Sequence, residues 1–227
     1  MIAARALVLL ALLAAACAPV RHAGPRSGPD PETSGFLDDY KNLRPVEDGS
    51  NARVYRNPDA HWTTYKQVLL EPVSLWRSGR RSLDPVPQAD LARVILDFET
   101  AVKRRLGSGY RLVEKPGPDV MRIRLGITSA RATDPVTDVL TAHGTGHDVK
   151  PTAGKGPLHP EMRRFLEGAA IEGEIRDSQT EVLLAQGVER RRREGAMPLE
   201  TWADVYRLFD AWAARLCARL EARTDPH

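Results

Sequence analysis

The residue types best suited to metal chemistry stand together in one glycine-rich stretch. His143, His147 and Asp148 lie within six residues, and imidazole nitrogen with carboxylate oxygen is a ligand set for zinc or copper. Histidines four apart share a face only on a helix, and Gly144 and Gly146 disfavour a helix here. We therefore favour a solvated loop, or one that orders on contact with a partner, over a metal site. We expect no metal and no other cofactor.

A second group of candidates lies on two alternating segments. Arg122 and Arg124 alternate with apolar residues in one segment, and Glu172 and Glu174 do so in another. Period two predicts strands with one face in the core and the other facing solvent. On neighbouring strands these side chains would form cross-strand ion pairs, each worth roughly 0.2–1 kcal/mol. A ligand surface and a glutamate acid–base pair are the alternatives.

A basic run follows the second of these segments. Arg190, Arg191 and Arg192 begin a series of four consecutive arginines, which glutamates flank on both sides. Clusters of this kind bind lipid phosphates, whereas a solvated strand end is the alternative. The formal net charge of +3 gives no reason to expect nucleic-acid binding.

Catalytic motifs do not occur in the sequence. It has no nucleophile elbow, phosphate-binding loop or HExxH motif, so we predict that the domain is not an enzyme. There are two cysteines, Cys17 and Cys217. If Cys17 carries lipid, no intramolecular disulfide can form. Cys217 stands beside an apolar stripe and is expected at the edge of the core.

The N-terminus predicts export and lipid anchoring. Arg5 precedes an apolar stretch that ends in Leu-Ala-Ala-Ala-Cys, which resembles a lipobox cleaved before Cys17, with Ala14 where leucine is usual. We expect a signal peptide at 1–16 and a lipidated Cys17. A Pro/Gly-rich linker continues to residue 33 and spans roughly 20–25 Å as a coil. An ordinary secretory signal is the alternative. The absence of aspartate after the cysteine points, by analogy, to the outer membrane.

The remaining chain predicts one domain at 34–222, with a long loop at 132–168 and a tail at 223–227. Phe36, Leu37 and Tyr40 have helix-like spacing and predict a short turn that docks on the domain. Apolar spacing predicts two amphipathic helices, and turn residues separate the expected strands. The expected elements are strands at 65–73, 110–114, 121–128, 169–176 and 182–189, a helix that begins near Pro87 and stops at Gly107, and a helix at 201–220. This order, β-α-β-β-β-β-α, predicts an α+β two-layer sandwich with a mostly antiparallel sheet and both helices on one face.

Several segments resemble a known family. They are Ser-Gly-Phe-Leu-Asp-Asp-Tyr at 34–40, Asn-Pro-Asp at 57–59, Tyr-Lys at 65–66, Ala-Ile-Glu-Gly-Glu-Ile-Arg-Asp-Ser at 170–178 and Thr-Trp-Ala-Asp-Val at 201–205. In order and spacing they resemble the proteobacterial lipoproteins of domain of unknown function 3313, from about residue 34 to residue 220. The resemblance implies an N-terminal lipobox and adds no catalytic residues.

Together these features predict a membrane-anchored lipoprotein of the bacterial envelope that faces the periplasm. Its expected role is a non-enzymatic binding module, or an accessory to assembly or transport, with an envelope protein as partner. Two alternatives remain at this point. One is an envelope hydrolase or ligand-binding protein acting on lipid, cell wall or glycan, and the other is a self-associating structural component.

Overall fold

The computed structural model describes residues 33–78, 83–129, 137–141, 156–191 and 196–224. Several predicted features lie outside the described residues. These are the signal peptide, Cys17 and its linker, His143, His147 and Arg192.

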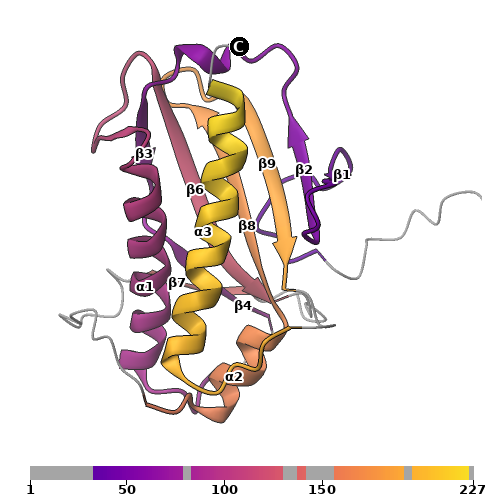
Figure 1. Ribbon diagram of the computed structural model, residues 1–227, viewed down its shortest axis with the longest axis vertical. Helices are drawn as coiled ribbons and strands as arrows, with labels where there is room; N and C mark the ends of the chain where they lie inside the picture. The colour runs from indigo at the N-terminus through magenta and orange to yellow at the C-terminus, as the bar shows by residue number, and fades with distance from the viewer. Residues whose placement is uncertain (1–32, 79–82, 130–136, 142–155, 192–195, 225–227) are drawn as a thin grey trace, which may run out of the picture.

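A nine-stranded sheet forms one layer of the domain (Figure 1). Its order is β1-β2-β9-β8-β6-β3-β5, and β4 pairs with β6 and with β7. Antiparallel pairs outnumber parallel ones. The strands are β1 (Arg44–Pro45), β2 (Ala52–Arg56), β3 (Gln67–Leu70), β4 (Ser74–Ser78), β5 (Arg111–Leu112), β6 (Val120–Ser129), β7 (Thr137–Thr141), β8 (Ala169–Asp177) and β9 (Leu183–Arg190).

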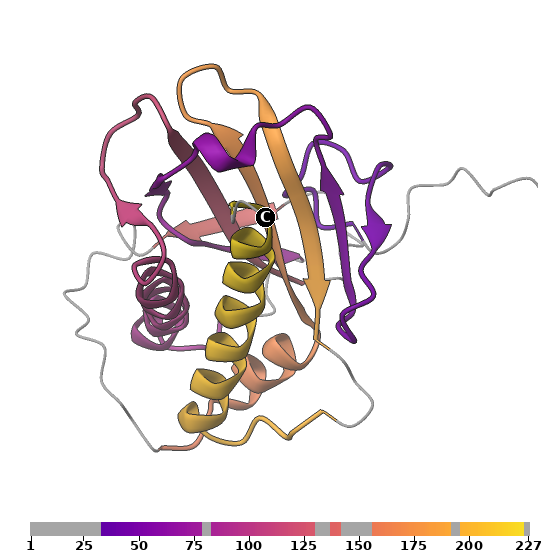
Figure 2. The same cartoon turned by 45° about the horizontal axis from the view of Figure 1, so that its top comes forward.

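Helices α1 (Gln88–Leu106) and α3 (Trp202–Thr224) pack side by side on one face of this sheet (Figure 2). A short helix, α2 (Pro160–Glu167), lies near the N-terminal end of α3, and a 3₁₀ turn, η1 (Trp62–Thr64), precedes β3. The helices meet through Phe98 of α1, which packs against Phe209 and Trp212 of α3 at ring-centroid distances of 5.2 and 6.4 Å. The predicted α+β sandwich with both long helices on one face is confirmed.

The stretch at 132–168 is not one long loop, because it contains β7 and α2. Helix α2 begins without a serine, threonine or aspartate cap. Pro160 instead occupies its first turn, and His159 Nδ1 accepts the backbone N–H of Glu161 at 3.3 Å. The strand expected at 110–114 is also shorter, because only Arg111 and Leu112 pair with β3.

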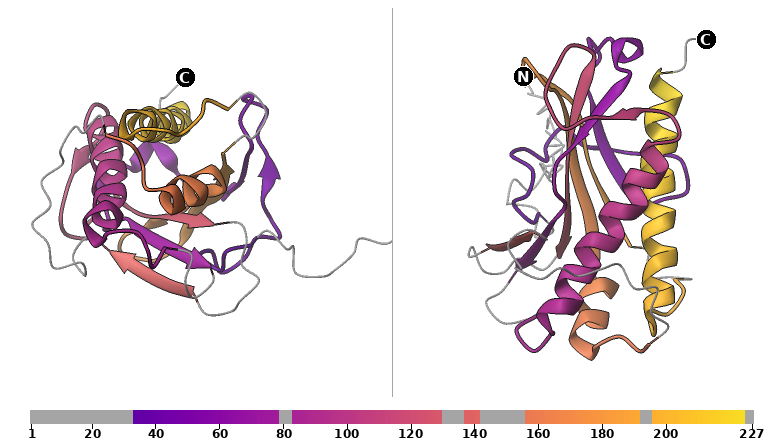
Figure 3. Two further views of the ribbon diagram at one scale, coloured as in Figure 1. Left: turned by 90° about the horizontal axis from the view of Figure 1, so that it is seen from below. Right: turned by 90° about the vertical axis from the view of Figure 1, so that its left-hand side faces the viewer.

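The opposite face of the sheet is covered by the N-terminal segment, here called the strap (residues 34–43). Figure 3 (right) shows the helices on one side of the sheet and this segment on the other. Phe36, Leu37 and Leu43 form a second buried cluster with side chains from β8 and β9. The predicted docking of this segment is confirmed. The expectation that the polar strand face meets solvent is wrong, since Glu172 and Glu174 are 1% and 5% exposed.

Candidate functional site

The strap packs closely on the sheet because β6 has a glycine, Gly126, where the Phe36 ring lies. A Cβ atom placed on Gly126 of β6 would lie 2.6 Å from ring carbons of Phe36, so only glycine leaves room for the ring at this point of the strand. The same ring packs edge-on against Trp76 of β4, with centroids 5.2 Å apart. Arg124 also contacts the ring, with its guanidinium carbon 4.5 Å from the ring centroid.

Tyr40 of the strap bonds to a buried carboxylate, that of Glu172. Its hydroxyl donates to Glu172 Oε2 at 2.6 Å, while Thr128 donates to Glu172 Oε1 at 2.8 Å. The same Tyr40 oxygen lies 3.2 Å from the Ser34 hydroxyl and accepts the backbone N–H of Leu37 at 3.1 Å. Burial and the charge of Glu172 raise the pKa of Tyr40. The phenol therefore stays protonated and remains a donor.

Glu174 lies between two arginines on the same face. Arg124 Nε donates to it at 3.0 Å and Arg176 Nε at 3.2 Å, and Arg124 also donates to the carbonyl of Phe36 at 3.1 Å. Burial alone would raise the pKa of Glu174, but the hydrogen bonds and charges of Arg176 and Arg124 outweigh burial and lower it. The carboxylate is thus held in its charged form.

These contacts correct part of the predicted pairing. The expected pair between Arg124 and Glu174 occurs, and the two residues lie directly opposite each other on β6 and β8. Arg122 instead pairs with Glu71 and Glu181. Glu172 bonds instead to the hydroxyl groups of Tyr40 and Thr128. Through Tyr40 and through Arg124, which donates to the Phe36 carbonyl, this face of the sheet holds the strap.

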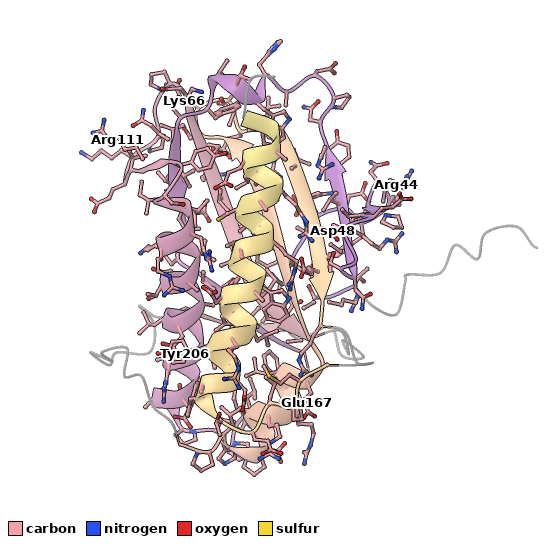
Figure 4. The ribbon with its side chains drawn as sticks, viewed as in Figure 1. Arg44, Asp48, Lys66, Arg111, Glu167 and Tyr206 are labelled. Carbon is pink, nitrogen blue, oxygen red and sulfur yellow. The ribbon has the colours of Figure 1, made fainter. Side chains whose placement is uncertain are left out.

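A second feature, here called the arginine cleft, lies between the end of β9, the turn at 48–51 and the N-terminal half of α3. It encloses about 410 Å³. Figure 4 shows Asp48 on the β9 and β2 side of α3 and Tyr206 on the α1 side. The charged residues that line the cleft are Arg190, Arg191, Arg207, Arg215, Asp48, Glu189 and Asp204.

Arg219 neutralises two of the three carboxylates, although it does not line the cleft itself. It donates to Asp48 Oδ2 from Nη2 at 2.8 Å and to Glu189 Oε2 from Nη1 at 2.7 Å. Burial alone would raise the pKa of Asp48, but hydrogen bonds from Ser50 and Arg219 hold it well below its usual value. Arg215 Nε donates to the other oxygen of Glu189 at 2.5 Å.

Asp204 lies in the first turn of α3 and caps the N-terminal end of that helix. Its Oδ2 accepts the backbone N–H groups of Thr201 and Glu200 at 2.7 and 3.0 Å, as in a capping box. Its Oδ1 accepts from Arg207. Across the cleft, Arg191 donates to the carbonyl of Met197. Burial lowers the pKa of Arg191, and the charge of Glu167 acts in the opposite direction.

A separate, mostly apolar cavity of about 100 Å³ lies between α3 and the sheet. It shares Glu189 and Trp212 with the arginine cleft as lining residues, and its other walls include Val54, Trp62 and Leu216.

The basic run thus enters the cleft only in part. The structure places Arg190 and Arg191 in its wall, as candidates that the sequence had identified. Sequence reasoning missed Arg207 and Arg215, because they lie on α3 far along the chain. The available signal was a stripe beside the apolar one, in which the positions 204, 207, 208, 211 and 215 recur at helical spacing.

The described residues contain no group of three or more His, Cys, Asp or Glu residues arranged to hold a metal ion. No helix in the described ranges is long and apolar enough to cross a membrane. Cys217 is buried, and burial together with the charge of Glu221 raises the pKa of its thiol to about 12.

A mixed sheet with two long helices on one face and a strap on the other defines a two-layer α+β domain. The chain belongs to the family described as Protein of unknown function (DUF3313), whose model matches residues 32–216.

Some solved structures share remote similarity. A PelC dodecamer from Paraburkholderia phytofirmans is 8% identical with a TM-score of 0.36, covering 74% of this chain and 95% of that chain. A DUF4136 family protein from Bacteroides thetaiotaomicron is 7% identical with a TM-score of 0.36, covering 82% and 98%. A PDZ domain protein from Parabacteroides distasonis is 8% identical with a TM-score of 0.38, covering 78% and 36%. No curated protein matches the chain in sequence.

Proposed function

We propose that this protein is a lipid-anchored module of the bacterial envelope, attached through Cys17 to the outer membrane and facing the periplasm. Its role is to bind or help assemble an envelope partner rather than to catalyse a reaction. The anchoring part of the proposal comes from the lipobox-like end of the apolar N-terminal stretch.

The observation that carries the proposal is the integration of the strap into the domain. The strap follows the expected linker directly, and its apolar side chains are buried in their own cluster. Arg124 and Gln186 hold its backbone through the carbonyls of Phe36 and Asp39, at 3.1 and 2.6 Å. A tether entering here would attach the domain at one defined position on the sheet.

This attachment supports a binding role for the opposite side. Strap and helices lie on opposite faces of the sheet (Figure 3). A membrane tether on the strap face therefore leaves α1, α3 and the arginine cleft accessible to a partner. A module built to position a surface needs this kind of fixed attachment more than it needs a catalytic centre.

Metabolic labelling with an alkyne palmitate tests the anchor. We expect the wild-type chain to carry label and to sediment with membranes, and the Cys17→Ala variant to lose both. Cys217→Ala is the matched control, because it removes the other cysteine of the chain and should label like the wild type. Label that persists in Cys17→Ala, or is absent from the wild type, contradicts lipid anchoring.

In-cell crosslinking of the same chains, followed by mass spectrometry, tests the role. One or two envelope proteins recovered in stoichiometric amounts with the wild type, and lost with Cys17→Ala, support a binding or assembly module. Turnover of lipid, cell-wall or glycan substrates by the purified protein would replace this proposal with an enzymatic one.

A further inference from the structure

We propose that the arginine cleft binds the phosphate group of an organic molecule. The inference concerns the cleft between β9 and α3 and does not depend on the lipid anchor. A free phosphomonoester and an anionic phospholipid headgroup both present negatively charged phosphate oxygens, and the experiment below separates them.

The first step is the supply of donors. Arg191 reaches the cleft from the end of β9, and Arg207 and Arg215 reach it from α3. A guanidinium carries five N–H donors in a fixed fork that matches phosphate oxygens. In the described part of the chain each of these side chains donates from one nitrogen to one acceptor residue. Arg207 and Arg191 donate from Nη2, and Arg215 donates from Nε. Donors therefore remain on all three side chains.

The second step is the electrostatic balance. Each carboxylate of the cleft already has hydrogen-bond donors, among them the cleft arginines Arg207 to Asp204 and Arg215 to Glu189. Arg219 and the hydroxyl of Ser50 bond to Asp48, and Arg219 also bonds to Glu189. Asp204 caps α3. An added anion would consequently meet guanidinium groups whose charge the nearby carboxylates only partly offset, and Arg191 is already partly desolvated.

The third step is the spacing on α3. Arg207, Ala211 and Arg215 are four residues apart and share one face of the helix. The two arginines are separated by roughly 12 Å along the axis, and the small Ala211 side chain lies between them. Both guanidinium groups can therefore turn toward the same space, which Arg191 closes from the β9 side.

The fourth step is the size and polarity of the walls. A volume of about 410 Å³ exceeds what a bare phosphate fills and falls in the range of small-molecule sites. Met197, Leu208 and Ala211 supply apolar wall beside the arginines, and Met197 is 47% exposed. An organic group attached to the phosphate would pack against this surface. This combination favours an organic phosphate over an inorganic ion.

The experiment uses the whole mature chain, residues 17–227, with Cys17→Ala so that no acyl chain contributes to binding. Titration calorimetry with glycerol 3-phosphate measures the free phosphomonoester. Co-sedimentation compares phosphatidylcholine vesicles with and without phosphatidylglycerol. We expect saturable binding to glycerol 3-phosphate, or sedimentation only with the phosphatidylglycerol vesicles, and the arm that responds identifies the source of the phosphate.

Variants assign the binding to the cleft. Arg207→Gln and Arg191→Gln should each weaken binding roughly tenfold, the effect of losing one charge-assisted hydrogen bond. Arg207 is 58% exposed in its side chain, so its replacement should leave the urea midpoint unchanged. Arg164→Gln is the matched control, since Arg164 forms the same i,i+3 ion pair at the start of α2, with Glu161.

Three outcomes overturn the inference. They are the absence of binding in both arms, equal sedimentation with neutral vesicles, and equal loss of binding in Arg164→Gln. None of them bears on palmitate labelling at Cys17, so failure of this inference is distinguishable from failure of the proposed anchor.

Discussion

The Tyr40 hydroxyl lies 2.6 Å from Glu172 Oε2, a contact between residues 132 positions apart in the chain. Glu172 is 1% exposed, and in the described part of the chain no cation pairs with it. A buried carboxylate is costly unless its oxygens accept hydrogen bonds. Tyr40 and Thr128 supply one donor to each oxygen. The strap therefore supplies a hydrogen-bond donor that a buried carboxylate of the sheet needs, in addition to covering that face.

Replacing Tyr40 should destabilise the domain more than the loss of one hydroxyl at the surface would. In Tyr40→Phe the ring remains, but Glu172 Oε2 loses its donor while still buried. We expect the free energy of unfolding to fall by about 1–3 kcal/mol. Urea denaturation followed by tryptophan fluorescence measures this change.

Tyr55→Phe is the matched control. Tyr55 packs against the same buried cluster, but in the described part of the chain its hydroxyl makes no hydrogen bond, so its replacement should change stability by less than about 0.5 kcal/mol. The double variant Tyr40→Phe/Glu172→Gln should lose less than the sum of the single variants. Additive losses would show that the two side chains do not act as a pair.

Gly126 offers a steric test of the same attachment. A methyl group at this position would overlap the Phe36 ring, which lies 2.6 Å from the Cβ position. Gly126→Ala should cost about 1–3 kcal/mol and speed proteolysis within the strap. In Gly117→Ala the nearest atom is Val120 Cγ2 at 3.6 Å, so this control should retain the wild-type cleavage rate. Strap cleavage at the wild-type rate in Gly126→Ala would refute the proposed seating.

The sequence predicts the strands of the sheet better than it predicts what covers them. Period-two patterns locate β6 and β8, because alternation follows directly from strand geometry. The same patterns make Glu172 and Glu174 look solvent-facing. Only tertiary packing places the strap over them. An irregular segment such as 34–43 has no repeating pattern of apolar residues from which the face on which it docks could be predicted.

The arginine cleft shows a different limit. Arg190 and Arg191 stand out in the sequence because they are consecutive. Arg207 and Arg215 are ordinary charged positions on an amphipathic helix. They join the others only because α3 packs beside β9, a contact that helix periodicity does not specify. Helix α2 is missed for a third reason, since its eight residues give just one repeat of apolar positions, Met162 with Phe165 and Leu166.

Glu174 should make the free energy of unfolding of the domain depend on pH in the acidic range. Its pKa in the folded state lies below the ordinary value of 4.5, because Arg176 and Arg124 outweigh burial. A lowered carboxyl pKa contributes stability that is present above the unfolded value and is lost as the pH falls through the folded one. At pH 7 we expect the free energy of unfolding of Glu174→Gln to be about 1–3 kcal/mol lower than that of the wild type.

The difference between Glu174→Gln and the wild type should shrink as the pH falls below 4.5, when the wild-type carboxylate gains its proton. Urea denaturation at a series of pH values measures it. Glu114→Gln is the control, because Glu114 is exposed and its side chain forms no hydrogen bond or ion pair in the described part of the chain. A gap for Glu174→Gln that is constant with pH would show that the two arginines do not stabilise the charged form.

The Cys217 thiol should be nearly unreactive in the folded protein. It is 4% exposed, and burial with the charge of Glu221 raises its pKa to about 12. Since the thiolate is the nucleophile, a rise from 9 to about 12 lowers its population at pH 8 by roughly a thousandfold. A Cys17→Ala chain, in which Cys217 is the remaining cysteine, should react with an aromatic disulfide at least about a hundredfold faster after unfolding in guanidinium. Adding Ser108→Cys to this chain supplies an exposed thiol near the end of α1 that should react at once in the folded state. Rapid reaction of both thiols before unfolding would mean that the helix layer opens around Cys217 far more often than its packing against α1 predicts.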